Sequence, residues 1–141
     1  MQLTHVHSIT CRDAVAVMKE FLMVAAGGAL GSVARWLLAM AVDARLAACW
    51  PGFPWGTLLV NVVGCLVIGV VAVWSDQSWV KHFVMFGILG GFTTFSSFAL
   101  QTSALAGNAA HAQFATYVVG SVLACLVAVW LGQLLGRLLV G

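Results

Sequence analysis

The chain has 141 residues, of which 62% are hydrophobic and 7% are charged, and its mean hydropathy is +1.06. A soluble domain carries about 25% charged residues, so this composition excludes a water-covered globular surface and indicates an integral membrane protein. The formal net charge of +2 is too small and too scattered to suggest nucleic-acid binding. The length allows one small helical bundle.

The cysteines and histidines form no catalytic or metal-binding pattern. Cys65 and Cys125 lie in apolar segments, where a free thiol behaves as a small hydrophobe, and Cys11 and Cys49 have no CxxC or Cys/His spacing. The histidines (His5, His7, His82 and His111) have no His or carboxylate partner at helical spacing, and no Ser/His/Asp arrangement is readable. We therefore predict neither an enzyme nor a structural disulfide.

Residues 1–17 are mixed in character and lack the apolar core and cleavage site of a signal peptide. We interpret them as an N-terminal extension, either a mobile segment or the product of an upstream start codon, and expect the membrane domain to occupy residues 18–141. The first span is predicted over about residues 21–42. Its Gly27 and Gly31 form a GxxxG pair, which lets another helix approach closely.

Arg35 lies late in this first span, where an arginine costs about 3 kcal/mol to insert. Two interpretations stay open. Arg35 is either a functional group that faces the interior of the bundle, or a side chain that reaches back to the far membrane interface.

A loop over residues 43–54 leads to the second span, predicted over about residues 55–74. Thr57, Asn61 and Gly64 fall at i, i+4 and i+7 and form one polar, narrow helix face. The Asn61 amide lies at hydrocarbon depth and must hydrogen-bond inside the protein. It serves either as a contact between helices or as a donor toward a hydrated pathway.

The third span, predicted over about residues 83–106, contains Gly-Ile-Leu-Gly-Gly-Phe-Thr-Thr-Phe-Ser-Ser-Phe at residues 87–98. Three glycines and four small hydroxyl residues disfavour a continuous helix, since glycine costs about 1 kcal/mol relative to alanine. In lipid, a break persists only where the freed carbonyl and N–H groups find partners in the protein or at an ion. We therefore predict a broken third helix and an ion-handling site beside it.

Past this break, Phe95 and Phe98 fall at i and i+3, with Thr94 and Ser97 beside them. The edge of a phenyl ring is positive, so paired ring edges beside hydroxyl donors can replace part of the hydration shell of a small anion. The alternative is that both rings simply pack, which is the commoner use of an aromatic stripe.

The fourth span is predicted over about residues 112–135. Its Tyr117, Ser121 and Cys125 fall at i, i+4 and i+8 and form a weakly polar stripe. A thiol is a weaker hydrogen-bond donor than a hydroxyl, so Cys125 is the least convincing member of the stripe.

The string Gly-Gly-Phe-Thr-Thr-Phe-Ser-Ser-Phe closely resembles the signature of the bacterial CrcB/Fluc fluoride channels. Gly-Ala-Leu-Gly-Ser-Val-Ala-Arg-Trp in the first span and Gly-Thr-Leu-x-x-Asn-x-x-Gly in the second are similar to motifs of the same family. The resemblance implies an all-α membrane protein of four transmembrane helices in a multi-pass, antiparallel, dual-topology homodimer. It also implies a bacterial inner membrane, two fluoride pores and a central sodium ion (Na+).

The resemblance also implies roles for individual residues. The backbone carbonyls of Gly90 and Thr93 would hold the sodium ion, and Arg35 would stand near a pore vestibule. The fluoride pore would be lined by two aromatic and six polar residues, namely Phe95, Phe98, Thr57, Asn61, Thr94, Ser97, Tyr117 and Ser121. Two positions depart from the family pattern: Cys125 stands where relatives commonly carry Ser, and Gln101 where many carry Glu.

The expected function is passive export of fluoride, with membrane lipid and a second copy of the chain as partners. The excess of Lys and Arg on the side of the termini is weak but favours cytoplasmic termini. One alternative is a small dual-topology exporter of cations or drugs, which needs a membrane-embedded Glu that no span contains. The other is a non-transporting membrane assembly protein whose glycine faces only pack helices.

Overall fold

The computed structural model describes residues 11–140, and their secondary structure is helical. The elements are α1 (Cys11–Leu46), α2 (Trp55–Trp74), the π-helix η1 (Val80–Leu89), α3 (Gly90–Phe92), α4 (Phe95–Gly107) and α5 (His111–Val140). Four segments are long and apolar enough to cross a membrane: Arg12–Leu46, Trp55–Trp74, Val80–Gly107 and His111–Val140. The prediction of an all-α protein with four spans is therefore confirmed.

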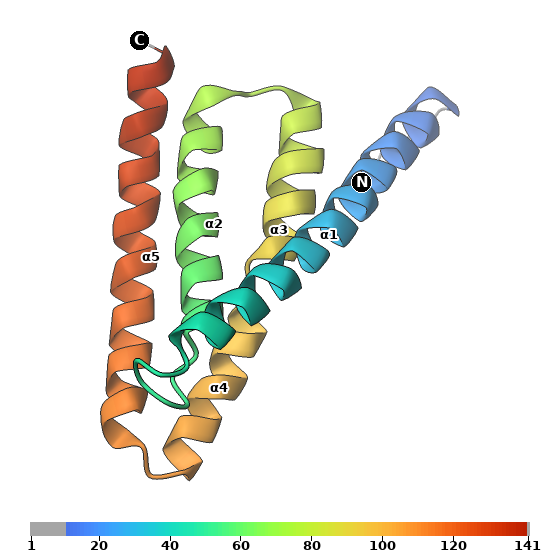
Figure 1. Ribbon diagram of the computed structural model, residues 1–141. Coiled ribbons are helices and arrows are strands. Elements are labelled where there is room, and N and C mark those ends of the chain that lie inside the picture. The colour runs from blue at the N-terminus through green and yellow to red at the C-terminus, as the bar shows by residue number, and fades with distance from the viewer. Residues whose placement is uncertain (1–10, 141) are drawn as a thin grey trace, which may run out of the picture.

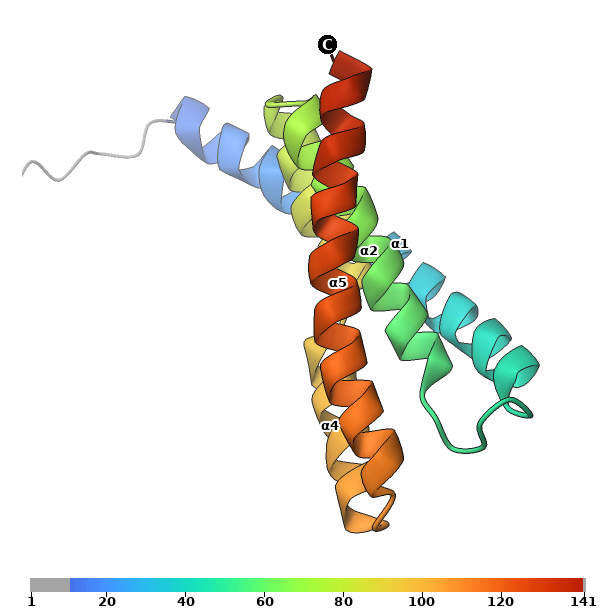
Figure 2. The same cartoon turned by 90° about the vertical axis from the view of Figure 1, so that its left-hand side faces the viewer.

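Three of the spans lie side by side, and the first crosses them (Figure 1). α2 and α5 run in the same direction side by side, and the third span, made of η1, α3 and α4, runs in the opposite direction next to them. α1 crosses the third span obliquely, and its first turns project away from the bundle (Figure 2). The described ends of the chain point toward the same end of the molecule, as an even number of spans requires.

Glycines set the distance between α2 and α5. A Cβ atom at Gly132 would overlap the Leu66 carbonyl oxygen, and one at Gly69 would overlap the carbonyl oxygen of Val129. Small residues let helix backbones approach in a membrane, where packing and hydrogen bonds replace the hydrophobic driving force between helices.

The GxxxG pair of α1 admits a close neighbouring helix, as predicted, and the structure shows that this neighbour is the third span. A Cβ atom at Gly27 would overlap the Phe83 carbonyl oxygen, and one at Gly31 would overlap that of Ile88. From the other side, a Cβ atom at Gly91 would lie 2.5 Å from the Gly28 carbonyl oxygen. Glycines on both helices thus bring the two backbones together.

The glycines of the third span were predicted to help break its helix, but Gly87 and Gly91 instead pack against α1. Gly87, Gly90 and Gly91, which were expected to interrupt the helix, are helical. The extended residues are Thr93 (φ −81°, ψ 156°) and Thr94 (φ −151°, ψ 114°), between α3 and α4. Threonine is β-branched and tolerates an extended backbone well, whereas the glycines are needed for contact with α1.

The helix ends also differ from the sequence-based bounds. α1 begins at Cys11 rather than near residue 21, so residues 11–17 of the predicted extension continue the first helix, and residues 1–10 lie outside the described part of the chain. No proline interrupts the sequence from Cys11 to Leu46, which allows one continuous helix. α5 likewise runs to Val140 rather than to about residue 135.

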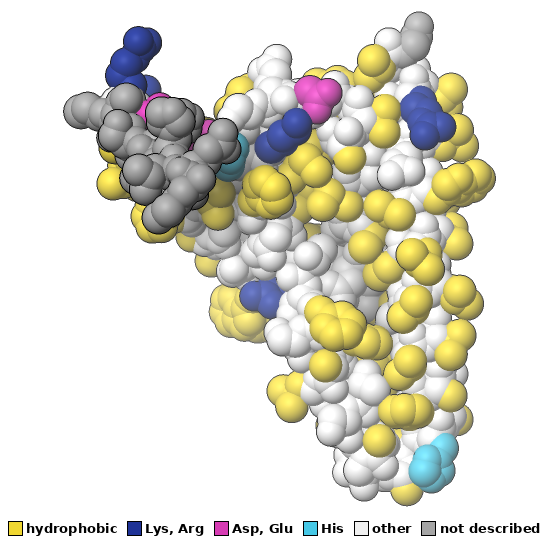
Figure 3. Space-filling view, turned by 180° about the vertical axis from the view of Figure 1, so that it is seen from behind, with side chains coloured by type: hydrophobic (Ala, Val, Ile, Leu, Met, Phe, Trp, Pro, Cys, Tyr) yellow, Lys and Arg dark blue, Asp and Glu magenta, His cyan; other side chains and the backbone are white. Residues whose placement is uncertain are grey.

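The outer surface is that of a membrane protein (Figure 3). Hydrophobic side chains are spread along the whole face shown, and charged side chains gather mainly at the end that holds the described chain ends. Large apolar side chains of α1 and α5 are exposed, including Trp36 at 60% and Trp130 at 61%. Such a surface suits lipid or another apolar partner better than water.

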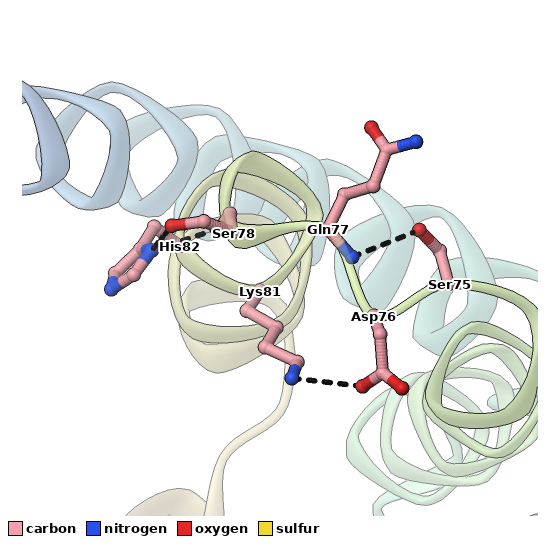
Figure 4. A network of polar contacts seen from close by, with 6 residues as sticks. All are labelled: Ser75, Asp76, Gln77, Ser78, Lys81 and His82. Carbon is pink, nitrogen blue, oxygen red and sulfur yellow. Dashed lines mark hydrogen bonds and ion pairs between the residues drawn. The ribbon is translucent and has the colours of Figure 1, made fainter.

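Polar contacts hold the loop between α2 and η1 in place (Figure 4). Lys81 Nζ lies 2.9 Å from the Asp76 carboxylate, and the Ser75 hydroxyl accepts a hydrogen bond from the Gln77 N–H. His82 Nδ1 lies 2.8 Å from the Ser78 carbonyl oxygen, and its Nε2 lies 3.6 Å from the Glu20 carboxylate of α1. The hydrogen bond from Lys81 holds the pKa of the Asp76 carboxyl below its ordinary value of 3.8.

Candidate functional site

Asn61 of α2 pairs with the backbone of Thr94, at the point where the third span is extended. The Thr94 N–H donates to Asn61 Oδ1 at 2.8 Å, and Asn61 Nδ2 donates to the Thr94 carbonyl oxygen at 3.1 Å. One side chain therefore pairs with both backbone groups of Thr94, including the N–H that a continuous helix would direct to the Gly90 carbonyl. Such compensation is required at membrane depth, where an unpaired backbone group costs several kcal/mol.

The two threonines also bond within the third span. The Thr94 hydroxyl accepts a hydrogen bond from the Ser97 N–H at 3.1 Å, so Thr94 is the N-cap of α4. The Thr93 hydroxyl donates to the Leu89 carbonyl oxygen at 3.0 Å, and its methyl group lies against Gly64, where a Cβ atom would overlap it. Gly64 of α2 is thus needed to admit the Thr93 side chain.

This bonding pattern takes the usual helical donors away from two carbonyls. In a continuous helix, the Gly90 carbonyl would accept from the Thr94 N–H and the Thr93 carbonyl from the Ser97 N–H. The first N–H donates to Asn61 instead, and the second donates to the Thr94 hydroxyl. The Gly90 and Thr93 carbonyls, which the family resemblance implied as sodium ligands, are therefore among the carbonyls at this junction whose helical donors are engaged elsewhere.

A groove of about 430 Å³ runs between α2, the third span and α5. Its polar lining comes from Asn61, Thr93, Thr94 and Ser121, together with the thiols of Cys65 and Cys125. Its apolar lining comes from Gly64, Ile68, Phe95, Phe98, Val122, Leu126 and Val129. None of these lining residues carries a carboxylate, an ammonium or a guanidinium group.

The groove offers hydrogen-bond donors without a fixed charge. Ser121 is 5% exposed, and its buried Oγ has no partner among the described residues, although a hydroxyl in an apolar setting costs free energy when it is unpaired. The Asn61 amide has two N–H groups, of which one is bonded to Thr94. The arrangement suits a small anion, which accepts hydrogen bonds and is repelled by carboxylates.

Aromatic rings form one wall of the groove and continue past it. The Phe95 and Phe98 ring centroids lie 5.5 Å apart, and Phe98 lies 5.1 Å from the ring of Tyr117 on α5. Phe95 is 78% exposed, whereas Tyr117 is fully buried and donates to Gln101 Oε1 at 2.8 Å. The Tyr117 hydroxyl also interacts with Thr57.

The structure brings most of the predicted site residues to one place. Six of them line or border the groove directly: Asn61, Thr93, Thr94, Phe95, Phe98 and Ser121. Ser97, Thr57 and Tyr117 are linked to this set by the contacts above but do not line the groove. Gly90 is exposed and outside the lining. Arg35 is partly exposed on α1, also away from the groove, and within residues 11–140 its guanidinium has no hydrogen bond or ion pair.

The structure gives two residues roles that were not expected from the sequence. Gln101 was noted only as a departure from a family pattern, but it is the acceptor for Tyr117. Cys65 was interpreted as an apolar filler, but it lines the groove opposite Cys125. Helical spacing could have indicated the position of Cys65, because Cys65 follows Asn61 by four residues, as Cys125 follows Ser121, and residues four apart share a helix face.

Comparisons with known proteins find a matching family model and several similar relatives. A family model described as CrcB-like protein, Camphor Resistance (CrcB), matches residues 22–133. A protein of Opitutus terrae named Fluoride-specific ion channel FluC is 47% identical over 124 residues, which cover 83% of this chain and 92% of that protein. A protein of the same name from Caulobacter vibrioides is 42% identical over 127 residues, 85% of this chain and 97% of the relative. A third, from Paracoccus denitrificans, is 46% identical over 120 residues, 83% and 94% of the two chains.

Proposed function

The chain belongs to the CrcB family, and we propose that it is a fluoride channel whose pathway follows the groove between α2, the third span and α5. The channel is passive, and it lowers the fluoride concentration in the cytoplasm. The observation that carries this proposal is the groove itself, in which amide, hydroxyl and ring-edge donors meet inside the membrane-spanning part with no carboxylate among the lining residues.

Fluoride would move along this groove by exchanging water for weak donors. The unpaired Ser121 hydroxyl and the second N–H of Asn61 offer conventional hydrogen bonds. The edges of Phe95 and Phe98 offer a weaker positive field. Because each contact is modest and none carries a full positive charge, the anion can enter and still leave, as conduction requires.

We propose that sodium binds at the carbonyls of Gly90 and Thr93. Unwound backbone carbonyls are typical ligands of sodium in membrane proteins, and these two have lost their helical N–H donors to Asn61 and Thr94. When bound, the ion supplies a fixed positive charge that favours anions nearby. Asn61 has a second role here, since it holds the Thr94 N–H away from the Gly90 carbonyl.

We further propose that two copies assemble as an antiparallel, dual-topology homodimer in a bacterial inner membrane. The exposure of Phe95 and Gly90 on a single chain supports a partner over this face. Arg12, Lys19, Lys81 and Arg137 lie toward one end and Arg45 toward the other, so the excess of Lys and Arg is weak, and the dual topology is proposed from the family resemblance. Arg35 would then stand near the vestibule of a pore.

Fluoride efflux from liposomes that contain the purified protein tests the function. We expect rapid efflux from the native protein and near-complete loss in the double variant Phe95→Ile/Phe98→Ile. The matched control is Phe21→Ile/Phe86→Ile, which removes two exposed phenyl rings outside the groove. No efflux from folded native protein would refute the channel, and full efflux from the groove variant would refute the pathway alone.

A further inference from the structure

Two thiols face each other in the wall of the groove. Cys65 comes from α2 and Cys125 from α5, both are partly exposed, and both line the groove. Their side chains interact with each other. Neither thiol is needed for the fluoride pathway described above, and neither is oxidised in the structure.

The register of α2 and α5 explains why the thiols meet. The helices run in the same direction, and Thr57 of α2 contacts Tyr117 of α5. Four residues further on, Asn61 and Ser121 both line the groove, and after four more residues Cys65 and Cys125 do so. Steps of four residues keep the same helix face, so the pairing of the thiols follows from close packing of parallel helices.

We propose that Cys65 and Cys125 form a two-coordinate binding site for one soft monovalent cation, of the class of Ag+ and Cu+. Thiolate sulfur is the protein ligand that such ions prefer, and two opposed thiolates complete a linear site without a third ligand. On binding, both S–H bonds lose a proton to water and two metal–sulfur bonds form, with no change of oxidation state. The product is one bound ion, two released protons and a site of net charge −1.

The geometry suits this chemistry. A linear site holds one ion between two sulfur atoms, and Cys65 and Cys125, which interact with each other and line the same groove, supply both. The two residues are partly buried but open to the groove, so an ion can arrive along it. Within residues 11–140 no group of three or more His, Cys, Asp or Glu could hold a metal, so a metal that demands four ligands is disfavoured.

This inference rests on the proposed function in one respect, namely its consequence for flux. The groove has no fixed charge in its lining, so a bound complex of charge −1 beside the pathway repels an entering anion at short range. A soft cation should therefore inhibit fluoride passage through the groove in which it binds.

Binding is tested first, without any measurement of flux. The other two cysteines are removed as Cys11→Ser and Cys49→Ser, and silver nitrate is titrated into the full-length protein in chloride-free detergent buffer. We expect one Ag+ per chain with release of two protons, and an affinity at least 100-fold lower after Cys65→Ser or Cys125→Ser. Two ions per chain, one ion per two chains, or unchanged affinity in the single variants would each overturn the proposal.

X-ray absorption at the silver edge gives a readout that needs no further variant. Two sulfur neighbours are expected, and any other number of sulfur neighbours contradicts the site. This keeps the test decisive if a single Cys→Ser variant fails to fold.

Flux is then measured in liposomes, with each protein compared with its own rate before silver. Inhibition of the protein that retains the pair, and none of the variant that lacks both thiols, supports the placement of the site in the pathway. Silver binding without inhibition contradicts that placement only. Absence of fluoride flux before silver is added would instead refute the proposed channel, so the two failures are distinguishable.

Discussion

The two halves of the third span are held in place by different means. The first half, η1 and α3, lies against α1 with backbone close to backbone, because glycines on both sides leave no side chain between them. The second half, α4, is held by side chains: Phe98 packs on Tyr117, and Gln101 accepts a hydrogen bond from the Tyr117 hydroxyl. The first kind of contact depends on the absence of side-chain volume, whereas the second depends on ring packing and a hydrogen bond.

Thr93 and Thr94 separate these halves, and a side chain of α2 pairs with the Thr94 backbone. Asn61 of α2 bonds both Thr94 backbone groups, and the Thr94 side chain caps α4. The comparison therefore predicts that added volume damages the first half, whereas lost hydrogen bonds damage the junction and the second half.

The largest effect is expected from added volume in the first half. In Gly31→Ala the new methyl group would overlap the Ile88 carbonyl oxygen, so α1 and the third span must separate. We expect a loss of about 3 kcal/mol of folding free energy, at the upper end of overpacking costs, measured as thermal unfolding in detergent. Gly28→Ala is the matched control, because its Cβ atom meets nothing within 4 Å. Equal melting of the two variants would contradict backbone contact as the cause.

The next effect tests the junction. Asn61→Leu leaves the Thr94 N–H and carbonyl without their side-chain partner, at an expected cost of about 2 kcal/mol, and fluoride efflux should fall with it. Asn61→Asp is the control: a neutral carboxylic acid retains one donor and one acceptor, so its stability should recover as the pH is lowered. If the Asn61→Leu protein has native stability, Asn61 contributes by packing alone and its hydrogen bonds do not stabilise the junction.

The sequence was enough to predict the four spans and the residues that form their polar faces. Hydropathy predicted the four spans, and the spacing of Thr57, Asn61 and Gly64 put them on one helix face. The sequence required an internal partner for Asn61 but could not name it, because Thr94 lies 33 residues away and is joined to Asn61 only by tertiary packing.

The sequence was not enough to predict the contacts that the glycines of the third span and Cys65 make. Helix propensity treats a glycine as a local weakness, but Gly87 and Gly91 are helical because α1 packs on them. Cys65 lies in an apolar segment, and only the register of α2 against α5 shows that it meets Cys125. Both misinterpretations concern contacts between helices, which single-helix periodicity does not contain.

A smaller effect is expected from the cap of α4. Thr94→Val retains the β-branched shape and removes the hydroxyl that accepts the Ser97 N–H, so the first turn of α4 loses its cap. The expected cost is about 1 kcal/mol, read from the same thermal unfolding. Thr94→Ser keeps the hydroxyl and should stay near native stability. If the two variants are destabilised alike, the shape of the side chain and not its hydroxyl decides the effect.

The smallest effect is expected at the loop that leads into the first half, where charge and not packing holds the chain. The hydrogen bond from Lys81 lowers the pKa of Asp76 below 3.8, so the ion pair stabilises the fold above that pH and is lost as the pH falls through the lowered pKa. Asp76→Asn should therefore melt slightly below the native protein at neutral pH and together with it well below pH 3.8. Because Asp76 is fully exposed, salt should shrink the neutral-pH difference. A stability difference that persists in acid, or that does not change with salt, would mean that Asp76 acts through packing. The loop would then not differ from the glycine contacts of the first half in how it is stabilised.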